Sequence, residues 1–242
     1  SNTVSQKDAG DTLPVFILRM KQSLIKFCFT VQQKLSLNVA EIIDLLEGYK
    51  ENFMQILTTD IQTKIRNAIV NDKCTPLEVM SSQHLSTLMQ YGLVDRVSKY
   101  EYNDRFLPFS SVVIELLEYI AFQYADLMFS YSQYLASMDA VIRQGMASLL
   151  SFVSDTFDKS LLRNSSAQSL AIYSQISINS DYVARATLFL EDFYFKKLSQ
   201  QSLTTNLSKA AASIGIFRVC QQLLLQTKSK ADEFMLRAIV KN

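Results

Sequence analysis

Residues Ser174 to Phe193 read SQISINSDYVARATLFLEDF, so that polar side chains interrupt an otherwise apolar segment. The four polar residues in question are Gln175, Asn179, Ser180 and Asp181. They form either a buried polar site that performs chemistry or a joint between two packed helices. Asn and Ser are preferred N-cap residues, and an acidic side chain in the first turn suits the positive end of a helix dipole. We therefore predict a structural helix joint, with one helix ending near Ile176 and the next beginning at Asp181.

The composition favours an all-α protein. Glycine and proline number only 5 and 3 among 242 residues, whereas average usage is about 7% and about 5%. Hairpin-rich folds need both residues at their turns, while long helices need neither. Apolar residues recur every three or four positions along most of the chain, as they do on the face of an amphipathic helix.

The predicted helices are long and are separated by short polar segments. The first begins after Thr12 and runs to Leu35, with Pro14 in its first turn. The second begins at Asn38, which forms a capping box with Glu41, and extends for about 50 Å at 1.5 Å per residue. That length is typical of a rod. Further helices are predicted over 111–135 after a cap at Ser110, 138–162 after a cap at Ser137, 167–176 after a loop at 164–166, 181–198 and 206–239.

The predicted rod has two bundles joined by a connector. Residues 1–12 are expected to be a disordered tag or linker, and the chain a fragment of something larger. The rod consists of a bundle over 13–71, a connector over 72–109 and a bundle over 110–242. Within the connector, Thr75 to Glu78 is expected to cap one short helix, and His84 to Tyr91 to form another that ends at Gly92.

Positive charge is concentrated near the end of the chain, although the net charge of the whole is only +1. That small net charge argues against nucleic acid as a partner. From Lys196 onward the chain contains eight basic residues and only two acidic ones, Asp232 and Glu233, so this segment has a net charge of +6. The segment is either a solvated helix face or a weak patch for an acidic protein or lipid surface. The lysines of the candidate patch are Lys196, Lys197, Lys228 and Lys230.

The sequence offers no set of residues for catalysis, and we expect no catalytic, cofactor-binding or metal site. The single histidine, His84, excludes a His-based zinc site and leaves one candidate base for a nucleophile. The five glycines are isolated, so no phosphate-binding loop exists. The three cysteines lack a CxxC spacing, which fits a reducing, cytosolic setting. No apolar run approaches the ~18 residues of a membrane span.

Three segments resemble the Sec-fifteen subunit of the exocyst vesicle-tethering complex. FLPFSSVV (Phe106 to Val113) is similar to that family's Phe-Pro-x-Ser-x-x-Val entry into a long helix, although Ile114 stands where relatives often have Pro. SMDAVIRQGMASLL (Ser137 to Leu150) resembles a family helix through Asp139 and Arg143. The segment quoted first resembles the family's Gln-Ile-Ile-Ile-Asn…Leu-Glu-Asp-Phe motif. The likeness reaches from Leu13 to the end of the chain, except for residues 75–104.

The resemblance implies a rod of stacked helical bundles and a scaffold without catalytic residues. It implies one subunit of an eight-subunit cytoplasmic assembly that holds secretory vesicles at the plasma membrane, peripheral to both membranes. Its implied partners are other exocyst subunits, above all the Sec-ten neighbour, and a secretory Rab GTPase in its GTP form. In the family the chain continues into a further helical subdomain, where much of the Rab contact is expected.

Two other functions remain open at this point. One is a different helical scaffold or adaptor, although no repeat of 34 to 47 residues supports a solenoid. The other is a helical GTPase regulator that supplies an arginine finger, with Arg143 or Arg185 as its candidate.

Overall fold

The computed structural model describes residues 12–94, 106–131, 138–163, 169–201 and 214–241. The helices are α1 (Leu13–Leu35), α2 (Ala40–Gly48), α3 (Lys50–Val70), α4 (Ser82–Gln90), α5 (Ser111–Glu118), the π-helix η1 (Tyr119–Ala125), α6 (Asp126–Tyr131), α7 (Asp139–Arg163), α8 (Ser169–Gln201) and α10 (Ile214–Lys241). Two strands, β1 (Leu77–Glu78) and β2 (Phe106–Leu107), pair in antiparallel register. The all-α prediction is confirmed.

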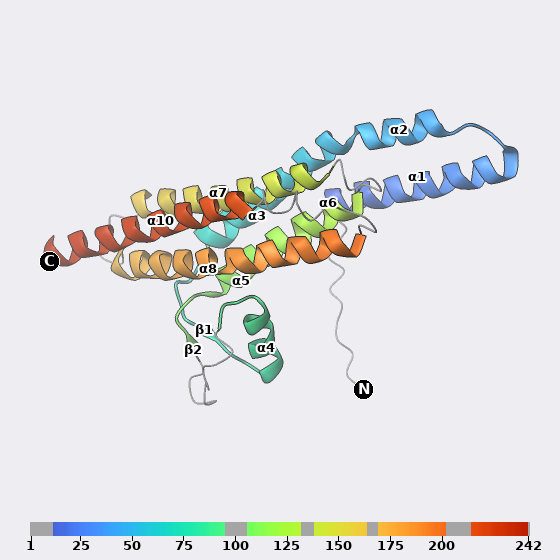
Figure 1. Cartoon of the computed structure of the whole chain (residues 1–242). Helices are drawn as coiled ribbons and strands as arrows, with labels where there is room; N and C mark the ends of the chain where they lie inside the picture. The colour runs from blue at the N-terminus through green and yellow to red at the C-terminus, as the bar shows by residue number, and fades with distance from the viewer. Residues whose placement is uncertain (1–11, 95–105, 132–137, 164–168, 202–213, 242) are drawn as a thin grey trace.

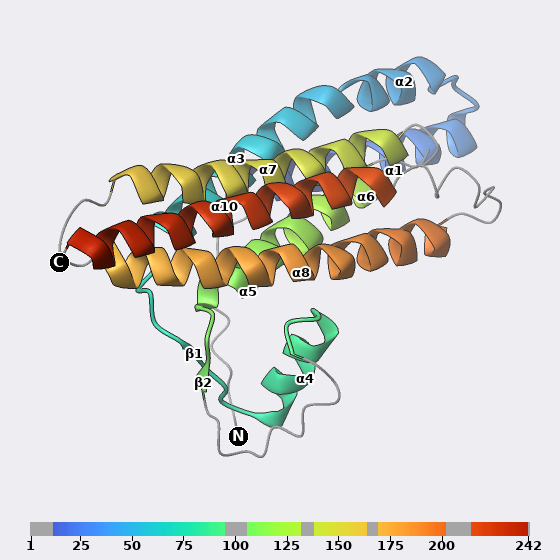
Figure 2. The same cartoon turned by 60° about the vertical axis from the view of Figure 1, so that its left-hand side comes forward.

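The long helices form an elongated bundle around one apolar core (Figures 1 and 2). Helices α7, α8 and α10 lie alongside one another, and α3 packs against α7 and η1. The core contains fully buried side chains from these helices and from α5, namely Ile61, Leu116, Ile120, Met146, Leu190 and Leu224. This cluster includes residues of both predicted bundles, 13–71 and 110–242. Within the described ranges, no helix is long and apolar enough to cross a membrane.

Helices α1 and α2 form a hairpin that extends beyond one end of the bundle (Figure 1). Lys21 of α1 holds this hairpin to α6, since its ammonium donates to the Glu47 carboxylate at 2.7 Å and to the Tyr131 carbonyl at 2.6 Å. The same ammonium lies 3.6 Å from the centroid of the Tyr131 ring. Burial lowers the pKa of Lys21, and Glu47 opposes that shift.

The predicted helix from Asn38 to Asn71 is two helices, α2 and α3, interrupted at Tyr49. The interruption follows Gly48, and glycine favours a helix interior less than any residue except proline. Asn38 still acts at the start of α2, because its side-chain oxygen accepts a hydrogen bond from the Ala40 backbone N–H at 3.1 Å. The prediction of a single long rod helix is therefore wrong in this part.

The predicted joint at Gln175, Asn179, Ser180 and Asp181 is wrong, because α8 runs through it without a break. Asn179 and Ser180 are fully buried in the middle of a helix of 33 residues. Asn and Ser favour caps because their side chains compete for nearby backbone groups. Here the Asn179 side chain bonds to distant segments instead, so it does not compete with the helix.

The predicted connector leaves the bundle as a small lobe of β1, α4 and β2 (Figure 2). The expected helix at Thr75 to Glu78 is wrong, since Leu77 and Glu78 pair with β2. Helix α4 is confirmed: Ser81 caps it by accepting the His84 backbone N–H at 3.1 Å, and Gly92 follows it with a φ of +69°. The predictions for residues 1–11, Ser137, 164–166 and the start of the last helix at Asn206 lie outside the described residues.

Candidate interaction sites

A buried polar network centred on Asn179 joins three segments of the chain. The Asn179 carbonyl oxygen accepts the Ser110 backbone N–H at 3.0 Å and the Gln175 amide at 2.9 Å. Its amide nitrogen donates to Asp72 Oδ2 at 3.1 Å and to Ser110 Oγ at 2.9 Å. Every hydrogen-bonding position of the amide is therefore used. We call Asp72, Ser110, Gln175 and Asn179 the Asn179 network.

The Asn179 network fixes the end of α3 and the beginning of α5 against α8. Ser110 occupies the N-cap position of α5, as predicted, but its hydroxyl donates to Asp72 at 2.8 Å rather than capping the helix. Gln175 also donates to the Pro108 carbonyl at 3.2 Å. Because buried polar groups are costly unless paired, a fully satisfied network specifies one arrangement of these segments. These contacts join segments that are distant in sequence, in place of the helix joint that was expected at Gln175 and Asn179.

Ser180 and Asp181 do not share that role. The Ser180 hydroxyl is buried and has no hydrogen-bond partner among the described residues. Asp181 forms an ion pair with Arg185 at 2.6 Å, one turn further along α8. Asp72 and Ser110 were not among the predicted site residues, because only the folded chain brings them to Asn179. A local signal was the i, i+4 spacing of Gln175 and Asn179, which places two amides on one helix face.

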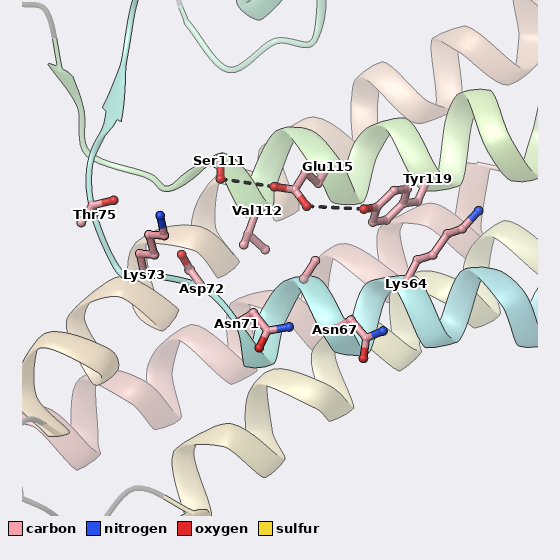
Figure 3. A pocket seen from close by; sticks show the side chains of 11 residues that line it. Lys64, Asn67, Asn71, Asp72, Lys73, Thr75, Ser111, Val112, Glu115 and Tyr119 are labelled. Atoms are coloured by element: carbon pink, nitrogen blue, oxygen red, sulfur yellow. Dashed lines mark hydrogen bonds between the residues drawn. The ribbon is translucent and has the colours of Figure 1, made fainter. Parts of the chain in front are cut away.

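A polar groove of about 530 Å³ lies beside the Asn179 network, between α3 and the start of α5 (Figure 3). It is lined by Lys64, Asn67, Ala68, Asn71, Asp72, Lys73, Thr75, Ser111, Val112, Glu115 and Tyr119. Glu115 lies on the α5 side of the groove, between Ser111 and Tyr119, and accepts hydrogen bonds from them at 3.3 and 3.4 Å. Burial raises the pKa of Tyr119, and the Glu115 carboxylate adds to that shift.

The groove fits a polar contact surface better than a catalytic centre. Cys74, which stands between the lining residues Lys73 and Thr75, has a pKa raised by burial and by Asp72, and a raised pKa makes a thiol less reactive. His84 does not line the groove. Its Nδ1 accepts the Met80 backbone N–H at 3.5 Å on α4. In the part of the chain that the structure describes, no group of three or more His, Cys, Asp or Glu could hold a metal ion.

The four lysines of the predicted basic patch each have a carboxylate partner. Lys196 pairs with Asp192, Lys197 with Asp126, and Lys228 with Asp232, at 2.6, 2.8 and 2.8 Å. Lys230 pairs with Asp158 of α7. Asp126, Asp158 and Asp192 lie outside the segment whose charge was counted as +6, so the folded chain neutralises charge that the sequence left unopposed.

The structure also separates these lysines into two pairs. Helix α10 runs antiparallel to α8, since Gln221 donates to the Ala184 carbonyl and Ser177 donates to Asp232. Lys228 and Lys230 therefore lie beside the first half of α8, whereas Lys196 and Lys197 lie near its C-terminal end. The pairs are about 28 Å apart along the helix axis, more than the ~8 Å over which salt screens charges. A solvated helix face is the better interpretation.

The two arginines considered as arginine fingers are both held by their own helices. Arg143 forms two hydrogen bonds to Asp139, at 3.2 and 2.8 Å. Arg185 pairs with Asp181 and lies 5.2 Å from the centroid of the Tyr182 ring. An arginine finger must reach a phosphate on another protein. The doubly bonded Arg143 is poorly suited to that reach.

Comparison with known proteins identifies one family. The family model described as "Exocyst complex subunit Sec15 C-terminal" matches residues 41–239. That range contains the Asn179 network, the polar groove and all the helices from α3 to α8. No curated protein and no solved structure matches the chain. Since the family model covers most of the sequence, the chain belongs to the Sec15 C-terminal family of exocyst complex subunits.

Proposed function

We propose that the chain is a non-catalytic scaffold of the exocyst that helps to tether secretory vesicles to the plasma membrane. In this role it binds other exocyst subunits, with the Sec-ten neighbour as the first candidate. It also acts as an effector of a secretory Rab GTPase in its GTP form. It reaches vesicles and sites of exocytosis as a peripheral component of the complex.

The observation that carries this proposal is the match of residues 41–239 to an exocyst subunit family. Two features of the molecule support action by contact. The bundle is built from long helices with one continuous core, which suits a rigid spacer. The polar groove around Glu115 also presents lysine, amide, hydroxyl and carboxylate groups, which suit polar contacts with another protein.

The effector role is tested by a pull-down of the 242-residue chain against a panel of secretory Rab GTPases. Each Rab is locked in its GTP form, and the same Rab locked in its GDP form is the matched control. We expect one or more Rabs to bind only in the GTP form, because an effector recognises segments that the γ-phosphate orders. Absence of binding to every GTP-locked Rab would contradict the effector role of this chain.

The scaffold role is tested separately by co-expression with the Sec-ten subunit and co-purification at raised salt. We expect the two chains to remain together, since a structural partner buries apolar surface that salt does not screen. A pair that separates at moderate salt would contradict a stable scaffold contact.

A GTPase regulator remains the second candidate, and a turnover assay distinguishes it from an effector. The exposed Arg185 is the better of the two candidate fingers because its guanidinium is held by a single ion pair. A regulator accelerates GTP hydrolysis by a factor of about 10³–10⁵, and that gain is lost in Arg185→Ala. An effector leaves the rate unchanged.

A further inference from the structure

An apolar stripe on α1 has no partner in the described structure. Leu13, Phe16, Met20, Leu24 and Phe27 are between 43% and 64% exposed. Another face of α1 packs against the bundle, because Leu18, Ile25 and Cys28 are buried there. A continuous row of large apolar side chains on a surface marks an interaction site, whereas scattered ones do not.

The spacing of the stripe specifies the shape of its occupant. Its residues follow one another at intervals of three, four, four and three positions. This is close to the heptad spacing at which one helix packs its side chains into another. From Leu13 to Phe27 the stripe is about 21 Å long at 1.5 Å per residue. An amphipathic helix of about two heptads covers it, and a third heptad reaches Lys34.

The charge beside the stripe specifies the chemistry of that helix. Helix α1 carries Arg19, Lys21, Lys26 and Lys34 and has no acidic residue. At 100° per residue, Arg19 and Lys26 fall along one edge of the stripe, and Lys34 lies in line with the stripe, seven residues beyond Phe27. Neither Lys26 nor Lys34 forms an ion pair with any residue that the structure describes. This contrasts with the four lysines near the end of the chain, each of which is neutralised.

We propose that α1 docks an amphipathic helix of another polypeptide, with acidic side chains of that helix against Lys26 and Lys34. This surface is additional to the Rab and Sec-ten contacts proposed above and does not depend on them. Opposite charges at the flanking positions of paired helices select the partner and its orientation. Helix α1 lies outside the matched range 41–239, so the family match says nothing of its partner.

Two other occupants fit the charges less well. An anionic membrane would meet the exposed Glu41 and Asp44 of α2 at the same end of the molecule. A second copy of the chain would bring two basic α1 helices together. Pairing of α1 with the acidic α2 of a second copy avoids that repulsion, but α2 has only nine residues and leaves much of the stripe uncovered.

The test uses two designed peptides of about three heptads with the same leucine seam. One carries Glu at the positions beside the seam and the other carries Lys. Binding to the chain is measured by fluorescence anisotropy at physiological salt. We expect the acidic peptide to bind and the basic one not to bind. Phe16→Ser combined with Phe27→Ser should weaken binding by about tenfold or more, since both rings lose their burial.

A charge exchange and a matched control make the test specific. Lys26→Glu combined with Lys34→Glu should reverse the preference, so that the basic peptide binds. Leu188→Ser removes an equally exposed apolar side chain, 65% exposed on α8, and should leave binding unchanged. Circular dichroism checks that each variant keeps its helices.

Three results would overturn the proposal. The first is that both peptides bind equally, or that neither binds. The second is a concentration-dependent dimer in sedimentation that the Phe16→Ser, Phe27→Ser variant abolishes and that the acidic peptide does not dissociate, which would assign the stripe to a second copy. The third is binding to vesicles rich in phosphatidylserine together with failure to bind the acidic peptide, which would assign it to a membrane surface.

Discussion

Replacing Asn179 with alanine tests whether the Asn179 network holds the bundle together. Asn179→Ala leaves the buried backbone N–H of Ser110 without its acceptor, which costs about 1–3 kcal/mol. It also removes a hydrogen bond to the Asp72 carboxylate, and bonds to charged groups contribute about 1.5–3 kcal/mol. The free energy of unfolding should therefore fall by about 3–5 kcal/mol. Loss of a helix cap would lower it by only about 1 kcal/mol.

Ser180→Ala is the matched control, one position away on the same helix. Its hydroxyl is buried without a hydrogen-bond partner among the described residues, so its removal leaves no group unpaired. Alanine also favours a helix interior more than serine does. The free energy of unfolding should stay the same or rise by up to about 1 kcal/mol.

The assay is urea unfolding followed by far-ultraviolet circular dichroism, with thermal melting as a second measurement. For a chain of this size, 1 kcal/mol corresponds to about 2–4 °C in Tm, so Asn179→Ala should melt about 6–20 °C lower. The reasoning is refuted if both variants lose a similar, small amount of stability. That result would mean that neither side chain has the tertiary role assigned here.

Three further predictions follow from other buried groups. Gly145→Ala should be destabilised by about 1–3 kcal/mol in urea melts, because a Cβ would overlap the Tyr124 phenol, and Tyr124→Leu should restore part of the loss. Burial raises the pKa of Tyr124 to about 12, above about 10 in the unfolded chain. The neutral phenol therefore contributes its full stabilisation of the folded chain below pH 10, and this contribution is lost as the pH rises toward 12. In melts between pH 10 and pH 12, the free energy of unfolding of Tyr124→Phe should fall less than that of the wild type, by up to about 2.7 kcal/mol. The same fall in both proteins would contradict the raised pKa of Tyr124. Lys21→Met should speed amide hydrogen exchange in α1 and α2 but not in α8, since Lys21 holds the hairpin to α6; equal exchange in wild type and variant would count against that role.

The helical class and most helix ends could be predicted from local signals. Scarce glycine and proline, apolar periodicity, Pro14 at the start of α1 and Gly92 after α4 all act within a few residues of the feature that they specify. The break between α2 and α3 was missed because glycine inside a helical pattern is often tolerated. The pairing of β1 with β2 was missed because two residues per strand give no periodicity.

The candidate sites could be predicted only in part, because their partners are distant in sequence. Asn179 carries the side chain of a good cap, but Asp72 and Ser110 lie 107 and 69 residues before it and satisfy that side chain inside the helix. The excess charge after Lys196 disappears in the same way, through acids on α6 and α7. Counting caps or charges along the sequence cannot predict such contacts, because the partners are distant in sequence.

The distance in sequence that separates Asn179 from its partners also sets an order of events during synthesis. A ribosome that adds about 5–20 residues per second makes Asp72 about 5–20 s before Asn179. When α3 and α5 have been made, α7, which packs against α3, and α8, which packs against α5, still have to be made. The nascent chain therefore presents a hydrophobic surface for seconds before its cover is made. A chaperone that binds apolar segments at the ribosome exit would find its main substrate in this first half of the chain.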